Sequence, residues 1–350
     1  MSRTGEFLPK GETTKFFWGS DRMSRGSVHS PAPAWRVGLF LLLATFAFGS
    51  AARAGEKLRV GIPATAAFSF MPVEFAEKLG IYKKNGVEVE QIVLLGSGKL
   101  HQAMSAGAID IAVGAGTDFA FLVKGAPELG IAATAGQPLD MGFVVPYDSP
   151  AKTADDLRGK KLGISTVGAL TDWLAHRLAQ LKGWKPEELI EVAVGSDKNA
   201  EAAFIVTHQI DAMITGSASG LQLEETQRGR LLFPASDIVG DFIDHAIFAS
   251  HDILTKDPAA VRAFLKSWFE TVAYEKTHRA ETIAEAVKEM RRSEAVEAKE
   301  YDLVLKMYSD DGRFPASGLK VMARSFVELG LLDTEPDLTK YYTEKYLPGM

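Results

Sequence analysis

The sequence of 350 residues contains no cysteine. This absence excludes disulfide bonds, thiolate metal ligands, cysteine nucleophiles and thioether-linked lipid anchors. The seven histidines include no His-x-x-x-His pair, and no Gly-x-Ser-x-Gly elbow is present. Neither a zinc hydrolase nor an α/β-hydrolase is therefore predicted. We expect no metal site and no cofactor.

Glycine-rich nucleotide motifs are missing as well. The pair Gly98-Lys99 resembles the end of a phosphate-binding loop, but Val93 stands where that motif requires glycine. Leu100 replaces the Ser or Thr that would bind magnesium. Nucleotide hydrolysis is therefore not predicted.

Long apolar runs are also scarce. The uncharged run at residues 37–48 is well short of the ~20 residues that span a bilayer. It follows three arginines at positions 22, 25 and 36, and a small-x-small sequence comes after it at residues 52–54. This order is typical of a secretory signal peptide and less so of a retained membrane anchor. We predict a signal peptide over residues 1–54, cleaved after Ala54.

The charge of the remaining chain is acidic. Removing residues 1–54 takes away 7 of the 39 basic and 3 of the 45 acidic residues, which leaves a formal charge of −10. Such a surface argues against nucleic acid as a partner. The polar stretch before Arg22 looks like an over-extension, so Met23 is an alternative start to Met1.

After the signal peptide, the sequence repeats itself at an offset of about one hundred residues. Each copy has an apolar strand with a central glycine, a loop of small residues and an Ile-Asp pair. The glycines are Gly61 and Gly163, and the loops are residues 96–99 and 195–198. The Ile-Asp pairs are residues 109–110 and 210–211. The order of strand, loop and helix predicts two βαβαβ units with parallel sheets. Chance similarity of α/β segments is the alternative.

Two such units predict a two-lobed α/β fold with helices on both faces of parallel-rich sheets. We expect the first lobe at residues 55–142 plus 247–350 and the second at 143–246. The chain would cross between the lobes twice, with hinges near residues 142–145 and 244–247. The apolar spacing from Val261 to Phe269 predicts that the C-terminal segment is helical and packs on the first lobe.

Three segments carry a resemblance to a known family. They are residues 75–87 (FAEKLGIYKKNGV), 107–112 (GAIDIA) and 156–164 (DLRGKKLGI). With them, nearly everything after Lys57 resembles the periplasmic binding proteins of the nitrate, sulfonate, taurine and thiamine-precursor group. The resemblance implies a periplasmic binding protein type II fold and a ligand gripped between the lobes at the carboxyl ends of the strands, where parallel sheets bind ligands in general. We expect a monomer.

The resemblance implies the substrate-binding component of an ABC importer, which delivers a small molecule to permease subunits in the inner membrane. Without a lipid anchor, an enclosed periplasm is the expected location. An enzyme is not expected, because the pyrimidine-precursor synthases of the same fold bear a cysteine-rich motif that this chain lacks. Such an enzyme and a periplasmic sensor subunit remain the two alternatives.

In the first lobe, four polar positions are candidate ligand contacts. Ser97 and Gly98 open a helix, where backbone N–H groups and the helix dipole suit a carboxylate or sulfonate. Thr117 can offer a hydroxyl and Asp118 can accept an amine. The alternative roles are a tight turn for the first pair and a helix cap for the second.

In the second lobe, the matching loop supplies four more candidate ligand contacts, at Thr166, Gly168, Thr171 and Asp172. His176 lies four residues after Asp172 and could pair with it on one helical face. Such pairs are more often surface contacts than catalytic dyads, so His176 is assigned no role.

Phe68 and Phe70 follow the first strand and are candidates for an apolar wall, with burial in the core as the alternative. Together these candidates suit a small organic anion or zwitterion. We expect a sulfonate, a taurine-like compound, an aromatic carboxylate or a thiamine-precursor pyrimidine.

Overall fold

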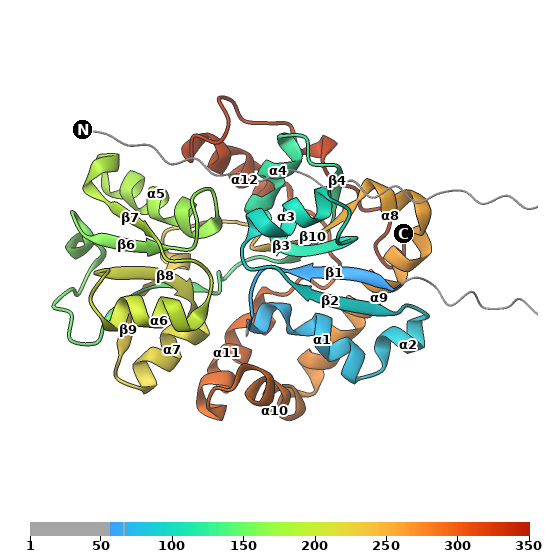
Figure 1. The fold of residues 1–350 in the computed structure, drawn as a ribbon, viewed down its shortest axis with the longest axis horizontal. Coiled ribbons are helices and arrows are strands. Elements are labelled where there is room, and N and C mark those ends of the chain that lie inside the picture. Colours follow the sequence, from blue (N-terminus) through green and yellow to red (C-terminus); the bar gives the residue numbers. More distant parts are fainter. Residues whose placement is uncertain (1–56, 66) are drawn as a thin grey trace, which may run out of the picture. The chain divides into compact units, whose positions relative to one another are not determined.

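The computed structural model describes residues 57–65 and 67–350 (Figure 1). The predicted signal peptide, its cleavage site and the alternative start Met23 lie outside the described residues. Among the residues described, no helix combines the length and apolarity required to cross a membrane.

In the part of the chain that the structure describes, ten strands form two five-stranded sheets, which confirms the predicted α/β fold class. The first sheet has the order β2-β1-β3-β10-β4, with β1 at Leu58–Ile62, β2 at Val89–Val93, β3 at Ile111–Ala115, β4 at Glu128–Ala135 and β10 at His245–Ser250. The second sheet has the order β7-β6-β8-β5-β9, with β5 at Met141–Pro146, β6 at Lys161–Ile164, β7 at Ile190–Ala193, β8 at Ala212–Gly216 and β9 at Gly229–Pro234.

Helices cover the two sheets (Figure 1). The helices between the strands β1 to β4 of the first sheet are α1 (Met71–Lys78), α2 (Ile81–Asn85), α3 (Ser97–Ser105) and α4 (Phe119–Val123). The second segment contributes α5 (Leu170–Lys182), α6 (Lys198–Val206) and α7 (Ser217–Glu225). The C-terminal segment is helical as predicted, with α8 (His251–Lys256), α9 (Pro258–Thr277), α10 (Arg279–Met290), α11 (Glu294–Met307) and α12 (Ala316–Glu328).

The repeat seen in the sequence is reproduced strand by strand. β1 pairs in parallel with β2 and β3, and β6 pairs in parallel with β7 and β8. Gly61 of β1 is the partner of Ala112 in β3, and Gly163 of β6 is the partner of Met213 in β8. The two sheets therefore share a register as well as a strand order.

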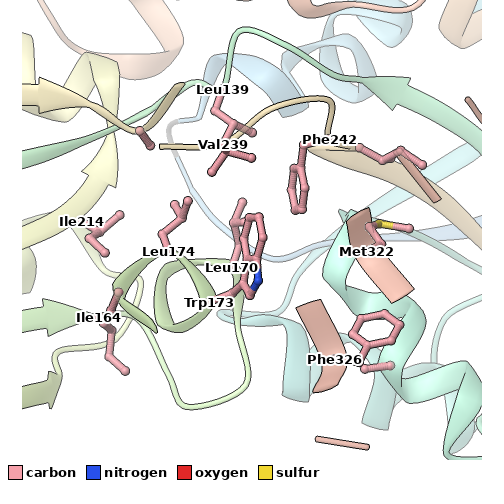
Figure 2. Packing of buried hydrophobic residues seen from close by; sticks show 14 of the residues in the cluster. Leu139, Ile164, Leu170, Trp173, Leu174, Ile214, Val239, Phe242, Met322 and Phe326 are labelled. Carbon is pink, nitrogen blue, oxygen red and sulfur yellow. The ribbon is translucent and has the colours of Figure 1, made fainter. Parts of the chain in front are cut away.

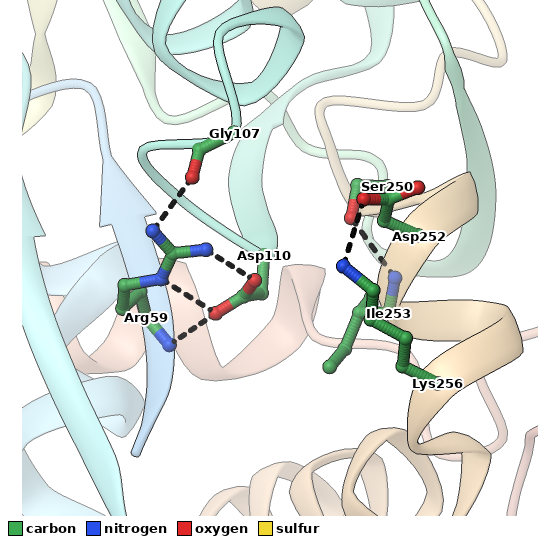
Figure 3. A network of polar contacts seen from close by, with 7 residues as sticks. All are labelled: Arg59, Gly107, Asp110, Ser250, Asp252, Ile253 and Lys256. Carbon is green, nitrogen blue, oxygen red and sulfur yellow. Dashed lines mark hydrogen bonds and ion pairs between the residues drawn. The ribbon is translucent and has the colours of Figure 1, made fainter. Parts of the chain in front are cut away.

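The Ile-Asp pairs have the same structural role in both sheets. Asp110 accepts the backbone N–H of Arg59 at 2.9 Å and pairs with its guanidinium at 2.7 Å (Figure 3). Asp211 accepts the backbone N–H of Lys161 at 2.8 Å. Each aspartate thus provides a hydrogen-bond partner for a backbone N–H near the start of the first strand of its repeat.

The isoleucines of these pairs explain the central glycines. A Cβ atom at Gly61 would lie 2.7 Å from Cδ1 of Ile109, and one at Gly163 would lie 2.7 Å from Cδ1 of Ile210. Both isoleucines are buried. Glycine in each strand is therefore needed because the isoleucine side chain packs closely against it.

Each sheet is completed by two further strands. β10 is antiparallel to β3 and β4, and β5 is antiparallel to β8 and β9. The chain passes between the sheets at residues 136–140 and 235–244. The hinges predicted at 142–145 and 244–247 lie largely inside β5 and β10, where hydrogen bonds to two neighbouring strands hold the backbone. The crossing segments are better placed to act as hinges, and the predicted lobe bounds remain predictions.

The C-terminal helices pack on both sheets' segments. α9 contacts α1 and α2, and the ring of Phe264 stacks on Tyr82 with centroids 6.1 Å apart. α11 contacts α7, and α12 contacts α5. The indole Nε1 of Trp173 in α5 donates to Glu328 in α12 at 3.1 Å. Packing on the first lobe alone, as predicted, therefore describes only part of this segment.

One buried apolar cluster joins the segments of the two sheets (Figure 2). Trp173 stacks on Phe242 of the second crossing, with ring centroids 4.7 Å apart and an angle of 9° between the planes. Met322 and Phe326 of α12 belong to the same cluster. Apolar burial therefore holds the crossing segments against both lobes.

Candidate functional site

A cavity of about 130 Å³ lies between the segments of the two sheets. Its walls come from the loop after β1, the end of β8, the starts of β5 and β10, both crossings, the starts of α5 and α7, and the region around α11. The residues that line it are Ala64, Ala67, Ser69, Phe70, Asp140, Met141, Leu170, Gly216, Ala218, Ser219, Asp244, His245, Arg292 and Glu300. The cavity thus lies where the repeated architecture places a ligand.

Two aspartates occupy equivalent places in the two crossings. Asp140 directly precedes β5, and Asp244 directly precedes β10. Oδ1 of Asp140 accepts the N–H of Ser217 at 3.1 Å. The backbone carbonyl of Asp244 accepts the N–H of Gly116 at 2.9 Å. Both crossings therefore bring one carboxyl group into the cavity, and each aspartate is hydrogen-bonded to its surroundings.

Three carboxyl groups share this small space. Asp140, Asp244 and Glu300 are all buried, and Asp140 and Glu300 hydrogen-bond each other through their side chains. Burial is the main cause that raises the pKa of each one, and the charge of Asp140 raises the pKa of Asp244 and Glu300 further. The protonated form is therefore favoured, because adjacent buried carboxylates repel each other.

His245 and Phe70 form the aromatic part of the wall. Their rings meet edge to face, with centroids 4.8 Å apart. Burial lowers the pKa of His245 to about 4, so its ring is neutral at pH 7. Nδ1 of His245 lies 3.3 Å from Oδ2 of Asp244, a contact between a neutral ring and a carboxyl group.

The one guanidinium in the cavity wall has an acidic partner. Nε of Arg292 donates to Oε1 of Glu297 at 2.5 Å, and both side chains are buried. The charge of Arg292 also opposes the rise in the pKa of Glu300. Arg292 therefore offsets the charge of the protein's own carboxylates.

This lining favours a ligand that donates hydrogen bonds. Neither carboxyl oxygen of Asp244 accepts a hydrogen bond of ordinary geometry from the described residues, so this carboxyl group can receive a donor. A carboxyl group next to a positive or N–H-bearing group becomes ionised, and the resulting charge-assisted hydrogen bond is short and strong. A bare oxyanion would instead face three acidic groups.

Phe70 is the member of the predicted ligand set that lines the cavity. Phe68, two residues earlier, is fully buried, and its ring meets the edge of Tyr301 at 6.3 Å. The backbone carbonyl of Phe68 accepts the hydroxyl of Tyr308 at 3.1 Å. Of the two aromatic candidates, the structure places Phe70 at the cavity and Phe68 in the core behind it.

Asp118 lies in a buried ionic network beside this region. Its Oδ2 accepts the N–H of Ala115 at 3.0 Å and lies 3.0 Å from Nε2 of His101. Nδ1 of His101 lies 2.9 Å from Glu128. The neighbouring Thr117 is buried, and its hydroxyl has no partner among the described residues. The predicted contacts of Thr117 and Asp118 with a ligand remain predictions.

The other loop candidates are not among the residues that line the cavity. Ser97 is the first residue of α3 and is partly exposed, and Gly98 is exposed. Thr166 is exposed, while Thr171 accepts the backbone N–H of Ser165 at 2.8 Å. Their contacts with a ligand also remain predictions.

Gly168 and Asp172 contact each other within the loop that leads into α5. Gly168 has a positive φ of 80° and donates its N–H to Oδ2 of Asp172 at 2.6 Å. Asp172 points toward His176 and Glu191 and does not line the cavity.

Sequence reasoning missed the acidic lining. A signal was available for Asp140 and Asp244, because each is an acidic residue placed directly before a buried apolar strand. Glu297 and Glu300 are three apart on the same helix as the buried Val304. Acidic residues on the apolar face of a helix indicate a buried polar site.

Residues 67–281, more than half of the chain, match the model of the family described as NMT1/THI5 like. No curated protein matches the sequence significantly.

Solved structures share the fold at low sequence identity. The periplasmic aliphatic sulphonate binding protein of Escherichia coli has a TM-score of 0.67 and 18% identity, over 83% of this chain and 92% of its own. The alkanesulfonate-binding protein of Xanthomonas axonopodis pv. citri, bound to MOPS, has a TM-score of 0.72 and 18% identity, over 83% and 98%. The periplasmic nitrate-binding protein of Synechocystis PCC 6803 has a TM-score of 0.67 and 15% identity, over 83% and 86%. The predicted family is thereby confirmed: the chain belongs to the NMT1/THI5-like family and has the fold of the periplasmic binding proteins.

Proposed function

We propose that the protein is the periplasmic substrate-binding component of an ABC importer and that its ligand carries N–H donors. The observation that supports this most directly is the set of three buried carboxyl groups, Asp140, Asp244 and Glu300, around one cavity between the two sheets' segments. The family and the fold agree with a binding role.

The carboxyl groups narrow the range of ligands predicted from the sequence. A sulfonate or carboxylate without an amine is ionised at pH 7, and Arg292, the guanidinium in the cavity wall, already pairs with Glu297. Such an anion would also oppose ionisation of the three acids, because it repels their carboxylate forms. A taurine-like zwitterion or an aminopyrimidine instead brings donors that the acids can accept. These two classes are therefore our candidates.

Of the two, the aminopyrimidine suits the cavity better. Its amino group donates a hydrogen bond, and the adjacent ring nitrogen accepts one. A protonated carboxyl group complements both, because its carbonyl oxygen accepts and its hydroxyl group donates. The flat ring can pack against Phe70, whose edge-to-face contact with His245 fixes its orientation. Asp244 is the carboxyl group with open acceptor positions. We therefore propose a thiamine-precursor aminopyrimidine as the ligand class, with Asp244 as its main acceptor.

The test is a thermal-shift and calorimetry panel on ligand-stripped mature protein. We expect 4-amino-2-methylpyrimidine to bind, and 2-methylpyrimidine, which lacks only the amine, to bind at least tenfold more weakly, because a carboxyl group would lose its donor. Taurine, ethanesulfonate, benzoate and nitrate complete the panel. Stabilisation by ethanesulfonate or nitrate alone would contradict the proposed acceptor site.

Substitution of Asp244, the proposed acceptor, provides a second test of ligand binding. Asp244→Asn keeps the shape and removes the charge, so we expect affinity for the aminopyrimidine to fall roughly 10- to 100-fold, or about 1.5–3 kcal/mol for a charge-assisted hydrogen bond. Ser97→Ala is the matched comparison at a strand-end loop outside the cavity, and we expect it to change affinity less. An unchanged melting temperature of the ligand-free variant separates a binding effect from unfolding.

Delivery to a permease, periplasmic location and the absence of catalysis belong to the same proposal. An importer component releases its ligand unchanged, so mass spectrometry of the bound molecule before and after prolonged incubation should find one compound. A new product would favour the enzyme alternative instead. Reconstituted uptake that requires the purified protein would distinguish an importer component from a sensor subunit.

A further inference from the structure

A second cluster of titratable side chains lies away from the cavity, on the segment of the second sheet. Asp172 and His176 lie one helical turn apart on α5, and Glu191 lies on the neighbouring strand β7. One ligand atom from each of the three side chains falls within 4.8 Å of the other two. None of the three lines the interlobe cavity.

The distances match those around a tetrahedral metal ion. Nε2 of His176 lies 3.2 Å from Oε1 of Glu191 and 3.6 Å from Oδ1 of Asp172. Ligands at about 2.0–2.2 Å from a tetrahedral zinc ion lie about 3.3–3.6 Å from one another. An imidazole and two carboxylates are also ligands that zinc accepts, whereas calcium and magnesium prefer oxygen ligands in larger number.

A buried oxygen without a partner points into this cluster. The side chain of Asp172 is 4% exposed, and its Oδ2 is held by the N–H of Gly168. Its Oδ1 has no hydrogen-bond donor among the described residues. A cation at this position would compensate the carboxylates of Asp172 and Glu191.

The surroundings leave one side of the cluster open. His176 and Glu191 line a groove of about 490 Å³, whose walls include Trp184 and Leu329. Glu328 lines the same groove as His176 and Glu191. A solvent molecule or ligand atom in the groove can therefore fill a fourth coordination position.

We infer that Asp172, His176 and Glu191 form a binding site for one divalent transition metal ion of the zinc type, with its fourth position open to the groove. This site is separate from the proposed ligand cavity. The inference rests on its own geometry and is independent of the proposed function.

The experiment uses the mature chain after dialysis against a chelator. Titration with Co²⁺ should give the intense visible absorption of a tetrahedral ion at one equivalent, and Zn²⁺ should displace it. His176→Asn and Glu191→Gln should each weaken binding roughly 10- to 100-fold, because even the residues that support metal ligands have effects of this size. Circular dichroism of the metal-free variants should match the unmodified protein.

His208→Asn is the matched control, because His208 lies 3.8 Å from Asp148 in an exposed pair to which the described residues add no third ligand. We expect this control to bind Co²⁺ like the unmodified protein. The site is refuted if the unmodified protein binds no Co²⁺ or gives only the weak spectrum of an octahedral ion. Equal affinity of the His176→Asn and His208→Asn variants would refute it as well.

Discussion

Replacement of His101 by leucine should lower the free energy of unfolding by about 3–5 kcal/mol at pH 7, the cost of removing one partner from a buried ionic network. His101 lies between Asp118 and Glu128, and all three side chains are at most 2% exposed. The variant would leave two buried carboxylates without their cation. Urea unfolding monitored by circular dichroism measures the change.

The pH dependence provides an independent check of the same network. Burial lowers the pKa of His101, but the charges and hydrogen bonds of Asp118 and Glu128 outweigh burial and raise the pKa to about 10. A raised pKa stabilises the folded state fully below the unfolded value of 6.5, and this contribution is lost as the pH rises through 10. The stability advantage over His101→Leu should therefore shrink between pH 6.5 and 10. An advantage that grows over this range would contradict a charged imidazole.

His251→Leu is the matched control for His101→Leu. His251 is the exposed first residue of α8. Surface substitutions of this kind usually stay within about 0.5 kcal/mol. A similar loss of stability in both variants would mean that the ionic network contributes nothing specific.

Replacement of Arg292 by methionine should also destabilise the protein by about 3–5 kcal/mol, because it leaves the buried Glu297 without the guanidinium that it contacts at 2.5 Å. It should raise the pKa of Glu300 further, since the charge of Arg292 opposes that rise. Chemical unfolding at pH 7 measures the loss.

A double-mutant cycle tests the mechanism behind this loss. Glu297→Gln removes the charge that Arg292→Met leaves uncompensated, so the double variant should regain part of the stability lost in Arg292→Met. Purely additive losses would show that Arg292 acts through packing and not through its charge.

The repeated part of the fold could be predicted because it has local signals. Glycine in a strand, an Ile-Asp pair and a small-residue loop recur at a constant offset, and the register of Gly61 and Gly163 shows that they have the same packing role. The positions of β5 and β10 could not be predicted in this way. Each pairs with strands that are distant in sequence, and nothing local specifies such partners.

The site was harder to predict than the fold. Loops at strand ends were chosen for hydroxyls, N–H groups and aromatic side chains, and of those candidates Phe70 lines the cavity. The acids of the cavity come from three separated parts of the chain, the two crossings and α11. Each segment can indicate a buried acid by itself, but only the tertiary fold shows that Asp140 and Glu300 share one space.

The late position of β10 in the sequence affects the order in which the two sheets fold. All five strands of the second sheet lie between β4 and β10 in sequence, so they are complete before β10 leaves the ribosome. Until then β3 and β4 lack the strand that separates them, and their unpaired edges can pair with other chains. A chain truncated before His245 would therefore keep a complete second sheet while its first sheet stays open and prone to aggregation. The first sheet, which contains the first strands to be synthesised, is therefore the last sheet to be completed.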